Sequence, residues 1–197
     1  MSTTTKKIAI TGGIGSGKSY ALTVLANAGY FTVSCDSVYG ELFNSQSFLR
    51  KLKKLFPDCV KGFFKLNADR KKISEQVFSD KQKLETLNAL THPLIIKECL
   101  LRMERCKAPV AFCEVPLLFE GGYQTFFDGV IVVVRDKKER IESVKQRSNL
   151  TETQIIARMN AQVDYDGMDL SQYTVIPNDG EFNQKVLQVA TDLLKDN

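Results

Sequence analysis

The sequence of 197 residues predicts an α/β protein built on a five-stranded parallel sheet flanked by helices. Short runs rich in apolar and β-branched residues alternate with longer segments of helical periodicity. One run, "GVIVVV" (129–134), is apolar on both faces, as a central parallel strand is. A glycine-rich turn separates the first strand-like run from the first helical segment. Together these features indicate parallel strands joined by right-handed helical crossovers.

Five runs are expected to form the strands: 7–11, 31–34, 110–115, 129–134 and 173–176. Between the second and third of them, residues 37–107 contain no convincing strand and are expected to be a helical insertion. Within it, Pro93 suits the first turn of a helix. Before the last strand, Thr151 and Gln154 have the spacing of a capping box, which predicts a helix starting there.

Composition narrows the class of protein. Apolar residues make up 43% and charged residues 25%, as in one compact globular domain. The net charge of +4 is too modest to indicate a nucleic-acid partner. The five cysteines have no C-x-x-C spacing and indicate reduced thiols. Since no apolar run approaches a membrane span and "MSTTTKK" lacks a signal-peptide core, we expect a cytoplasmic protein without a membrane partner, either a monomer or an oligomer.

The stretch "GGIGSGKS" after the first strand fits the P-loop pattern G-x-x-x-x-G-K-S. Glycines in such a strand-to-helix turn let backbone N–H groups converge on an anion at the positive end of the helix. ATP is the expected ligand, with Lys18 reaching the β- and γ-phosphates and the Ser19 hydroxyl ligating Mg²⁺. The nucleotide-binding residues are expected to be Gly12, Gly13, Ile14, Gly15, Ser16, Gly17, Lys18, Ser19 and Tyr20.

Two carboxylates follow predicted strands and favour a kinase. No asparagine begins an N-K-x-D motif, so a GTPase is not indicated. Asp36, after the second strand, would repel a phosphate acceptor but suits an alcohol, whose proton it can take; the alternative is a helix cap. Glu114 ends the third strand, where an acid would hold the water shell of Mg²⁺; the alternative is a loop turn. Ligands of such sheets bind at the carboxyl ends of the strands.

Arginines near the end of the chain indicate a lid. Arg140 and Arg147 are seven residues apart and share one helix face, and Arg158 lies on the next helix. They are expected to bring guanidinium groups over ATP, although each alone is more typical of a solvated surface. His92 is more typical of a structural residue than of an acid or base. The basic residues of 50–72 could attract an anionic substrate, but they are more typical of a solvated helix face.

Several motifs in order resemble the dephospho-CoA kinase family. They are "TGGIGSGKS", Asp36, "LNALTHPLI", "VPLLFE", "QR" (146–147), "ARMNAQ" and "VIPNDG", spread over about residues 7–180. The resemblance implies phosphorylation of the ribose 3′-hydroxyl of dephospho-CoA by ATP, the last step of coenzyme A biosynthesis. It also implies catalytic roles for Lys18, Asp36 and Arg147. The domain would comprise a core (1–36, 108–139 and 166–197), a CoA-binding insertion (37–107) and a lid (140–165).

The sequence departs from the family's pattern at five positions, which hold Tyr20, Ser34, Gly40, Ser143 and Met168. Three of these usually carry a positive charge in the family, and Arg140 would replace the one missing at position 143. Two alternatives therefore stay open: another small-molecule P-loop kinase with an alcohol acceptor, and a nucleotide-binding protein that has lost turnover.

Overall fold

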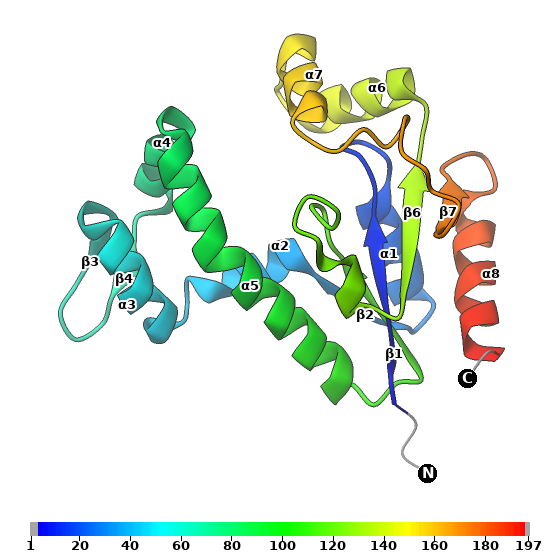
Figure 1. The fold of residues 1–197 in the computed structure, drawn as a ribbon, viewed down its shortest axis with the longest axis horizontal. Coiled ribbons are helices and arrows are strands. Elements are labelled where there is room, and N and C mark those ends of the chain that lie inside the picture. Colours follow the sequence, from blue (N-terminus) through cyan, green and yellow to red (C-terminus); the bar gives the residue numbers. More distant parts are fainter. Residues whose placement is uncertain (1–3, 196–197) are drawn as a thin grey trace. The chain divides into compact units, whose positions relative to one another are not determined.

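A computed structural model describes residues 4–195, which divide into two compact units. The first unit comprises Met1–Ser34 and Leu100–Asn197, and the second comprises Cys35–Cys99. Figure 1 labels the elements of both. The single domain expected from the sequence, with its insertion and lid, stays a prediction.

The first unit is built on a parallel sheet of five strands in the order β2-β5-β1-β6-β7. The strands are β1 (Lys6–Thr11), β2 (Phe31–Ser34), β5 (Val110–Glu114), β6 (Gly129–Val134) and β7 (Thr174–Pro177). Each lies within one residue of its predicted range, so the predicted sheet is confirmed. Because β1 is central and pairs with both β5 and β6, the loop that follows β1 leaves the middle of the sheet.

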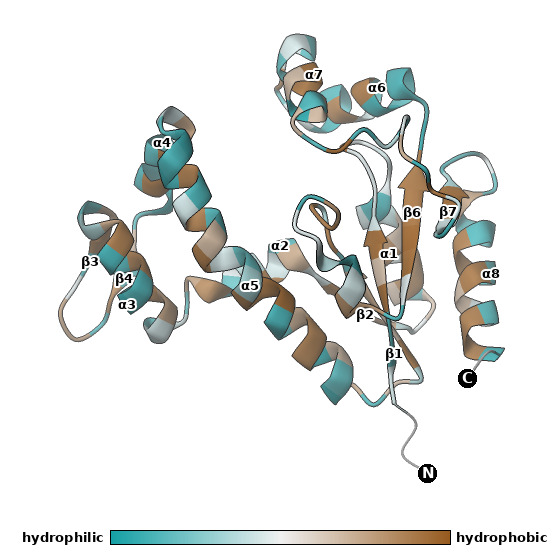
Figure 2. Ribbon diagram, viewed as in Figure 1, coloured by the Kyte–Doolittle hydropathy of each residue, from teal (hydrophilic) through white to brown (hydrophobic). Residues whose placement is uncertain are grey.

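Helices α1 (Lys18–Asn27), α6 (Lys137–Arg147), α7 (Glu152–Asn160) and α8 (Phe182–Lys195) complete this unit, with a 3-10 turn at Tyr123–Phe126. Apolar side chains of the sheet and of α1 and α8 share one core, which Figure 2 shows as brown strands. The predicted capping box is confirmed, since the Thr151 and Gln154 side chains each accept a hydrogen bond from the other residue's backbone N–H.

The second unit is helical and contains a small hairpin. Its elements are α2 (Cys35–Leu42), α3 (Gln46–Leu55), a 3-10 turn (Pro57–Cys59), β3 (Val60–Lys61), β4 (Asn67–Ala68), α4 (Arg70–Ser79) and most of α5 (Lys81–Arg105). A core of its own joins α3, α4 and α5 with the hairpin. The prediction that 37–107 contains no strand was wrong, because β3 and β4 pair through only two residues each, too short a run to show periodicity.

The prediction that Pro93 opens a helix was also wrong, because α5 runs without a break from Lys81 through Pro93. Proline lacks the N–H that would bond the carbonyl four residues earlier. Buried residues on both sides of it, Leu87 and Ile96 among them, hold the helix together by packing. Nearby, burial lowers the pKa of His92.

Candidate functional site

The glycine-rich segment forms a tight loop between β1 and α1, as predicted for a P-loop. Gly17 is the N-cap of α1 and adopts a left-handed conformation with φ of 105°. Gly15 also has a positive φ, of 80°, and a Cβ there would lie 2.5 Å from the carbonyl oxygen of Arg140. Only glycine fits such a position without strain. The loop therefore leads its backbone into the N-terminus of a ten-residue helix, where N–H groups lack intrahelical partners.

Beside the loop, a hydroxyl and a carboxylate meet. The Ser19 hydroxyl donates a hydrogen bond of 2.6 Å to Glu114 Oε1. Ser19 is in the first turn of α1, and Glu114 is the last residue of β5, paired in register with Ile10 of β1. Glu114 is only 4% exposed. Two oxygen ligands so close, one of them a nearly buried carboxylate, are of the kind that hard divalent cations prefer.

The segment after α7 is fastened to the P-loop and its strand. Gln162 Oε1 accepts a hydrogen bond of 2.7 Å from the backbone N–H of Ile14. Three residues later, the Tyr165 hydroxyl lies 3.0 Å from Thr11 Oγ1. Glu120 accepts from the N–H of Val163 at 3.0 Å. These contacts join residues more than 40 positions apart and close the segment against the loop.

Arg140 is the most buried basic residue of this region, and its charge is paired. Its side chain is 7% exposed, and Nη2 lies 2.6 Å from Asp166 Oδ2. Its Nη1 occupies the space that a side chain at Gly13 would need. Arg147, by contrast, is exposed at the end of the same helix. The two arginines predicted to act together therefore have different surroundings, and Arg140 serves the contact between α6 and the loop.

Asn178 is a site residue that reasoning from the sequence missed, although "VIPNDG" contains it. Its side-chain amide donates a 2.7 Å hydrogen bond to the carbonyl of Ser16. The Ser16 hydroxyl is buried and has no hydrogen-bond partner among the described residues. Only the order of family motifs pointed to Gln162 and Asn178, because neither carries a charge or a local pattern of its own.

Two further predicted site residues, Tyr20 and Asp36, lie in different units. The Tyr20 ring stacks on Phe182 of α8 with centroids 6.0 Å apart, and its hydroxyl accepts a hydrogen bond from Asn183. A packing contact thus occupies the side chain expected beside the nucleotide. Asp36 lies in the first turn of α2, in the second unit. Its position opposite the P-loop stays a prediction.

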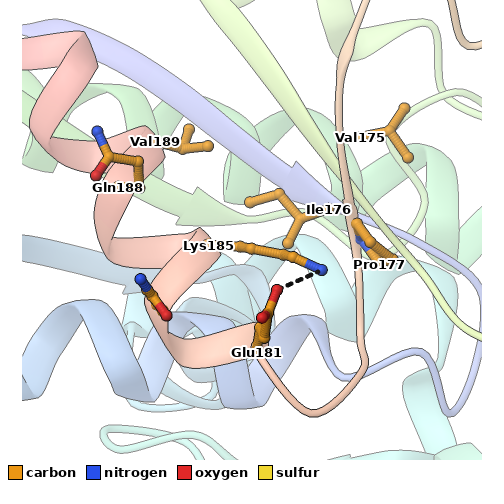
Figure 3. A pocket seen from close by; sticks show the side chains of 8 residues that line it. Val175, Ile176, Pro177, Glu181, Lys185, Gln188 and Val189 are labelled. Carbon is orange, nitrogen blue, oxygen red and sulfur yellow. Dashed lines mark ion pairs between the residues drawn. The ribbon is translucent and has the colours of Figure 1, made fainter.

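A groove lies on the far edge of the sheet, between β7 and α8 (Figure 3). Its volume is about 340 Å³, and its lining includes Val175, Ile176 and Lys185. Lys185 is already paired, with Asp179 at 2.6 Å and Glu181 at 3.6 Å. A groove whose lysine is neutralised in this way is a poor site for a triphosphate, so the loop at Gly12–Ser19 remains the candidate.

A strand, a glycine-rich loop, a helix and an acid on the neighbouring strand together define a P-loop kinase fold. The dephospho-CoA kinase family model matches residues 6–184. A dephospho-CoA kinase from Thermus thermophilus is 35% identical over 156 residues, covering 79% of this chain and 74% of the relative. The chain belongs to the dephospho-CoA kinase family. Its reaction is the phosphorylation of dephospho-CoA to coenzyme A, and neither of the two alternatives left open by the sequence is favoured.

Solved structures agree with this assignment. The crystal structure of TT1252 from Thermus thermophilus superposes with a TM-score of 0.80 at 30% identity, covering 98% of both chains. The dephospho-CoA kinase from Campylobacter jejuni gives 0.71 at 26% identity, covering 97% of this chain and 98% of that one. Among residues 4–195, every helix is too short or too polar to span a bilayer.

Proposed function

We propose that this chain transfers the γ-phosphoryl group of ATP to the ribose 3′-hydroxyl of dephospho-CoA, with Lys18, Asp36 and Arg147 as catalytic residues. The observation that carries the proposal is the pair formed by Ser19 and Glu114, whose oxygens lie 2.6 Å apart at the start of α1. A P-loop lacking a nearby acid would bind an anion. One with a nearly buried carboxylate beside its serine is also equipped to handle a nucleotide with its counterion.

The loop binds the phosphates through its backbone. N–H groups of the segment from Gly12 to Tyr20 surround the anion, and the N-terminus of α1 adds its positive dipole. Lys18 is the first residue of α1 and places its ammonium at the β- and γ-phosphates. There it stabilises the charge that spreads over the transferring group.

Ser19 and Glu114 are the residues that would hold Mg²⁺. The serine hydroxyl oxygen would ligate the ion directly, while its hydrogen is donated to Glu114, as in the 2.6 Å hydrogen bond already present. The carboxylate would hold the ion's water shell. When bound, the ion neutralises charge on the β- and γ-phosphates. A carboxylate 4% exposed and facing a hydroxyl fits this role.

Arg147 is the lid residue that would reach the transferring group. It ends α6, where it is exposed. Arg140, four residues after the α6 N-cap Asp136, is instead held by Asp166 and anchors the helix. We therefore assign the contact with phosphate to Arg147 and a positioning role to Arg140. Such a contact lowers the barrier more than it strengthens ATP binding.

Asp36 would accept the proton of the ribose 3′-hydroxyl as the new bond to phosphorus forms. Asp36→Asn keeps the shape of the side chain and removes the base. We expect turnover with dephospho-CoA to fall about 10²- to 10⁴-fold at an unchanged melting temperature. A near-normal rate with lowered stability would show that Asp36 only stabilises the first turn of α2.

The chain offers a matched control for that experiment. Asp69 is the N-cap of α4, and its carboxylate accepts a hydrogen bond of 3.0 Å from the N–H of Lys72. Asp69→Asn changes a capping aspartate in the same unit at a small cost in stability, well under about 1 kcal/mol because asparagine also caps. We expect its turnover to match the wild type.

The cysteines support a place for the enzyme in the reducing cytoplasm. All five are free thiols, and four of them are buried. Cys35 and Cys99 have sulfurs 3.9 Å apart and are not bonded. A chain with two thiols so close and no disulfide suits a compartment that keeps cysteines reduced.

A further inference from the structure

The hairpin of the second unit ends in two exposed phenylalanines. Phe63 is 90% and Phe64 is 97% exposed, and their rings meet edge to face with centroids 5.1 Å apart. Single exposed apolar residues are common on proteins, but two adjacent rings this bare are not. Figure 1 shows the loop that carries them, between β3 and β4, extending away from α4.

The base of the hairpin is firmly held, so the exposed rings are not the result of a loose chain. Leu66 is buried in the core of the unit, 7% exposed. The side chain of Gln46 bonds both backbone groups of Leu66, accepting from its N–H at 2.8 Å and donating to its carbonyl at 3.1 Å. Leu66 thus takes the core position, and the two rings before it point to solvent.

The tip itself is shaped by a glycine. Gly62 has φ of +106°, and a Cβ there would collide with the carbonyl of Lys65. Lys53, from α3, donates a hydrogen bond of 3.3 Å to the Gly62 carbonyl. The tip is therefore a fixed, convex wedge whose end is aromatic.

Positive charge surrounds the wedge. Lys61 and Lys65 flank the two rings, and all the basic side chains nearby are exposed. Residues 50–72 contain nine lysines or arginines and only two acids. One of the acids, Asp69, is the N-cap of α4. In Figure 2 the loop carries brown, and α3 and α4 each carry teal as well as brown.

We propose that the β3–β4 tip docks the enzyme reversibly on an anionic lipid bilayer, with Phe63 and Phe64 inserted among the headgroups and the lysines around them at the lipid phosphates. Aromatic rings flanked by lysines are the composition of interfacial membrane anchors. A convex tip suits a soft interface, whereas a nucleic acid or a peptide is more often bound in a groove or along a flat face. This docking is peripheral and differs from a membrane span.

The proposal is tested by flotation of the full chain with phosphatidylcholine vesicles, with and without phosphatidylglycerol. We expect binding only to the anionic vesicles, and weaker binding as salt rises because the charges are exposed. The double variant Phe63→Ser/Phe64→Ser should lower the partition coefficient by about 100-fold, since both rings leave the interface. Each of Lys61→Gln and Lys65→Gln should lower it by about fivefold.

A matched control distinguishes insertion of the β3–β4 tip from nonspecific adsorption of exposed aromatic residues. Phe78 is 81% exposed on α4, away from the hairpin. Phe78→Ser should leave the partition coefficient unchanged, and all variants should keep the wild-type melting temperature. Failure of the wild-type chain to float with anionic vesicles, or an equal loss for Phe78→Ser, overturns the proposal. So does binding of single-stranded DNA that competes with the vesicles and requires Phe63.

Discussion

Replacing Glu114 by glutamine separates the effect of this residue on stability from its effect on activity. Glu114 is 4% exposed, at the end of a strand whose five residues are all buried. Glutamine keeps the shape and an oxygen that can accept from the Ser19 hydroxyl, now 2.6 Å from the carboxylate. The variant removes only the negative charge.

The effect on stability is small or favourable. A hydrogen bond to a charged acceptor contributes about 1 kcal/mol more than one to a neutral acceptor, and the variant loses that difference. Burying an amide instead of a carboxylate avoids an effective desolvation penalty of several kcal/mol. The penalty is smaller here because Ser19, beside the carboxylate, is exposed to water. We expect the melting temperature of Glu114→Gln to be equal to the wild type or about 2–4 °C higher.

The effect on activity is large. A carboxylate that holds the water shell of the ion typically contributes 10- to 100-fold to metal affinity, by analogy with other outer-shell ligands. We expect the Mg²⁺ concentration for half-maximal turnover to rise by about that factor. The assay is coupled ADP release with dephospho-CoA as acceptor, titrated with Mg²⁺ at fixed ATP.

Ser19→Thr is the control, since threonine keeps the hydroxyl and should retain the wild-type titration. An unchanged Mg²⁺ titration for Glu114→Gln would refute the assignment of this acid. A melting temperature several degrees lower, with activity lost in proportion to folded protein, would show that Glu114 is a structural residue.

Three further predictions concern the contacts between the P-loop and the segment after α7. Gln162→Ala should lower kcat about tenfold and change ATP affinity less, because the Gln162 side chain holds the segment after α7 against Ile14 of the P-loop; equal changes in both would contradict that role. Asp166→Asn should lower the free energy of unfolding by about 1–2 kcal/mol, since it removes the charge paired with the Arg140 guanidinium, which is 7% exposed. Asp192→Asn, in an exposed pair with Lys195, should cost under about 0.5 kcal/mol. Burial raises the pKa of Tyr165 to about 12, so its neutral form stabilises the fold below pH 10 and this contribution is lost as pH rises from 10 to 12. Tyr165→Phe should therefore be about 1 kcal/mol less stable at pH 8 in urea unfolding, and the difference from wild type should shrink above pH 10.

The strands could be predicted because burial on both faces leaves a compositional trace. "GVIVVV" became β6 at its predicted residues, with four of its six residues buried. A capping box is likewise a local pattern, and Thr151 bore it out. These elements depend on residues within a few positions of one another, which is the range over which a single sequence carries information.

The features that the sequence did not predict depend on tertiary contacts. Pro93 is a strong local signal for a helix start, yet packing on both sides of it keeps α5 continuous. The hairpin β3–β4 has too few residues for periodicity. Gln162 meets Ile14 across 148 positions of sequence, and nothing around either residue shows the contact. Tertiary contacts decided all three.

The spacing of Arg140 and Arg147 predicts their shared helix face but not the surroundings of each side chain. A spacing of seven does place Arg140 and Arg147 on one face of α6, but Arg140 is buried whereas Arg147, at the end of the helix, is exposed. The backbone carbonyl of Arg140 approaches Gly15, and its guanidinium approaches Gly13. The glycines of the P-loop therefore leave room for α6, a packing role beside the phosphate binding that we propose for them. A methyl group at Gly15 would collide with the backbone carbonyl of Arg140, and one at Gly13 would displace the Arg140 guanidinium, before any nucleotide arrived.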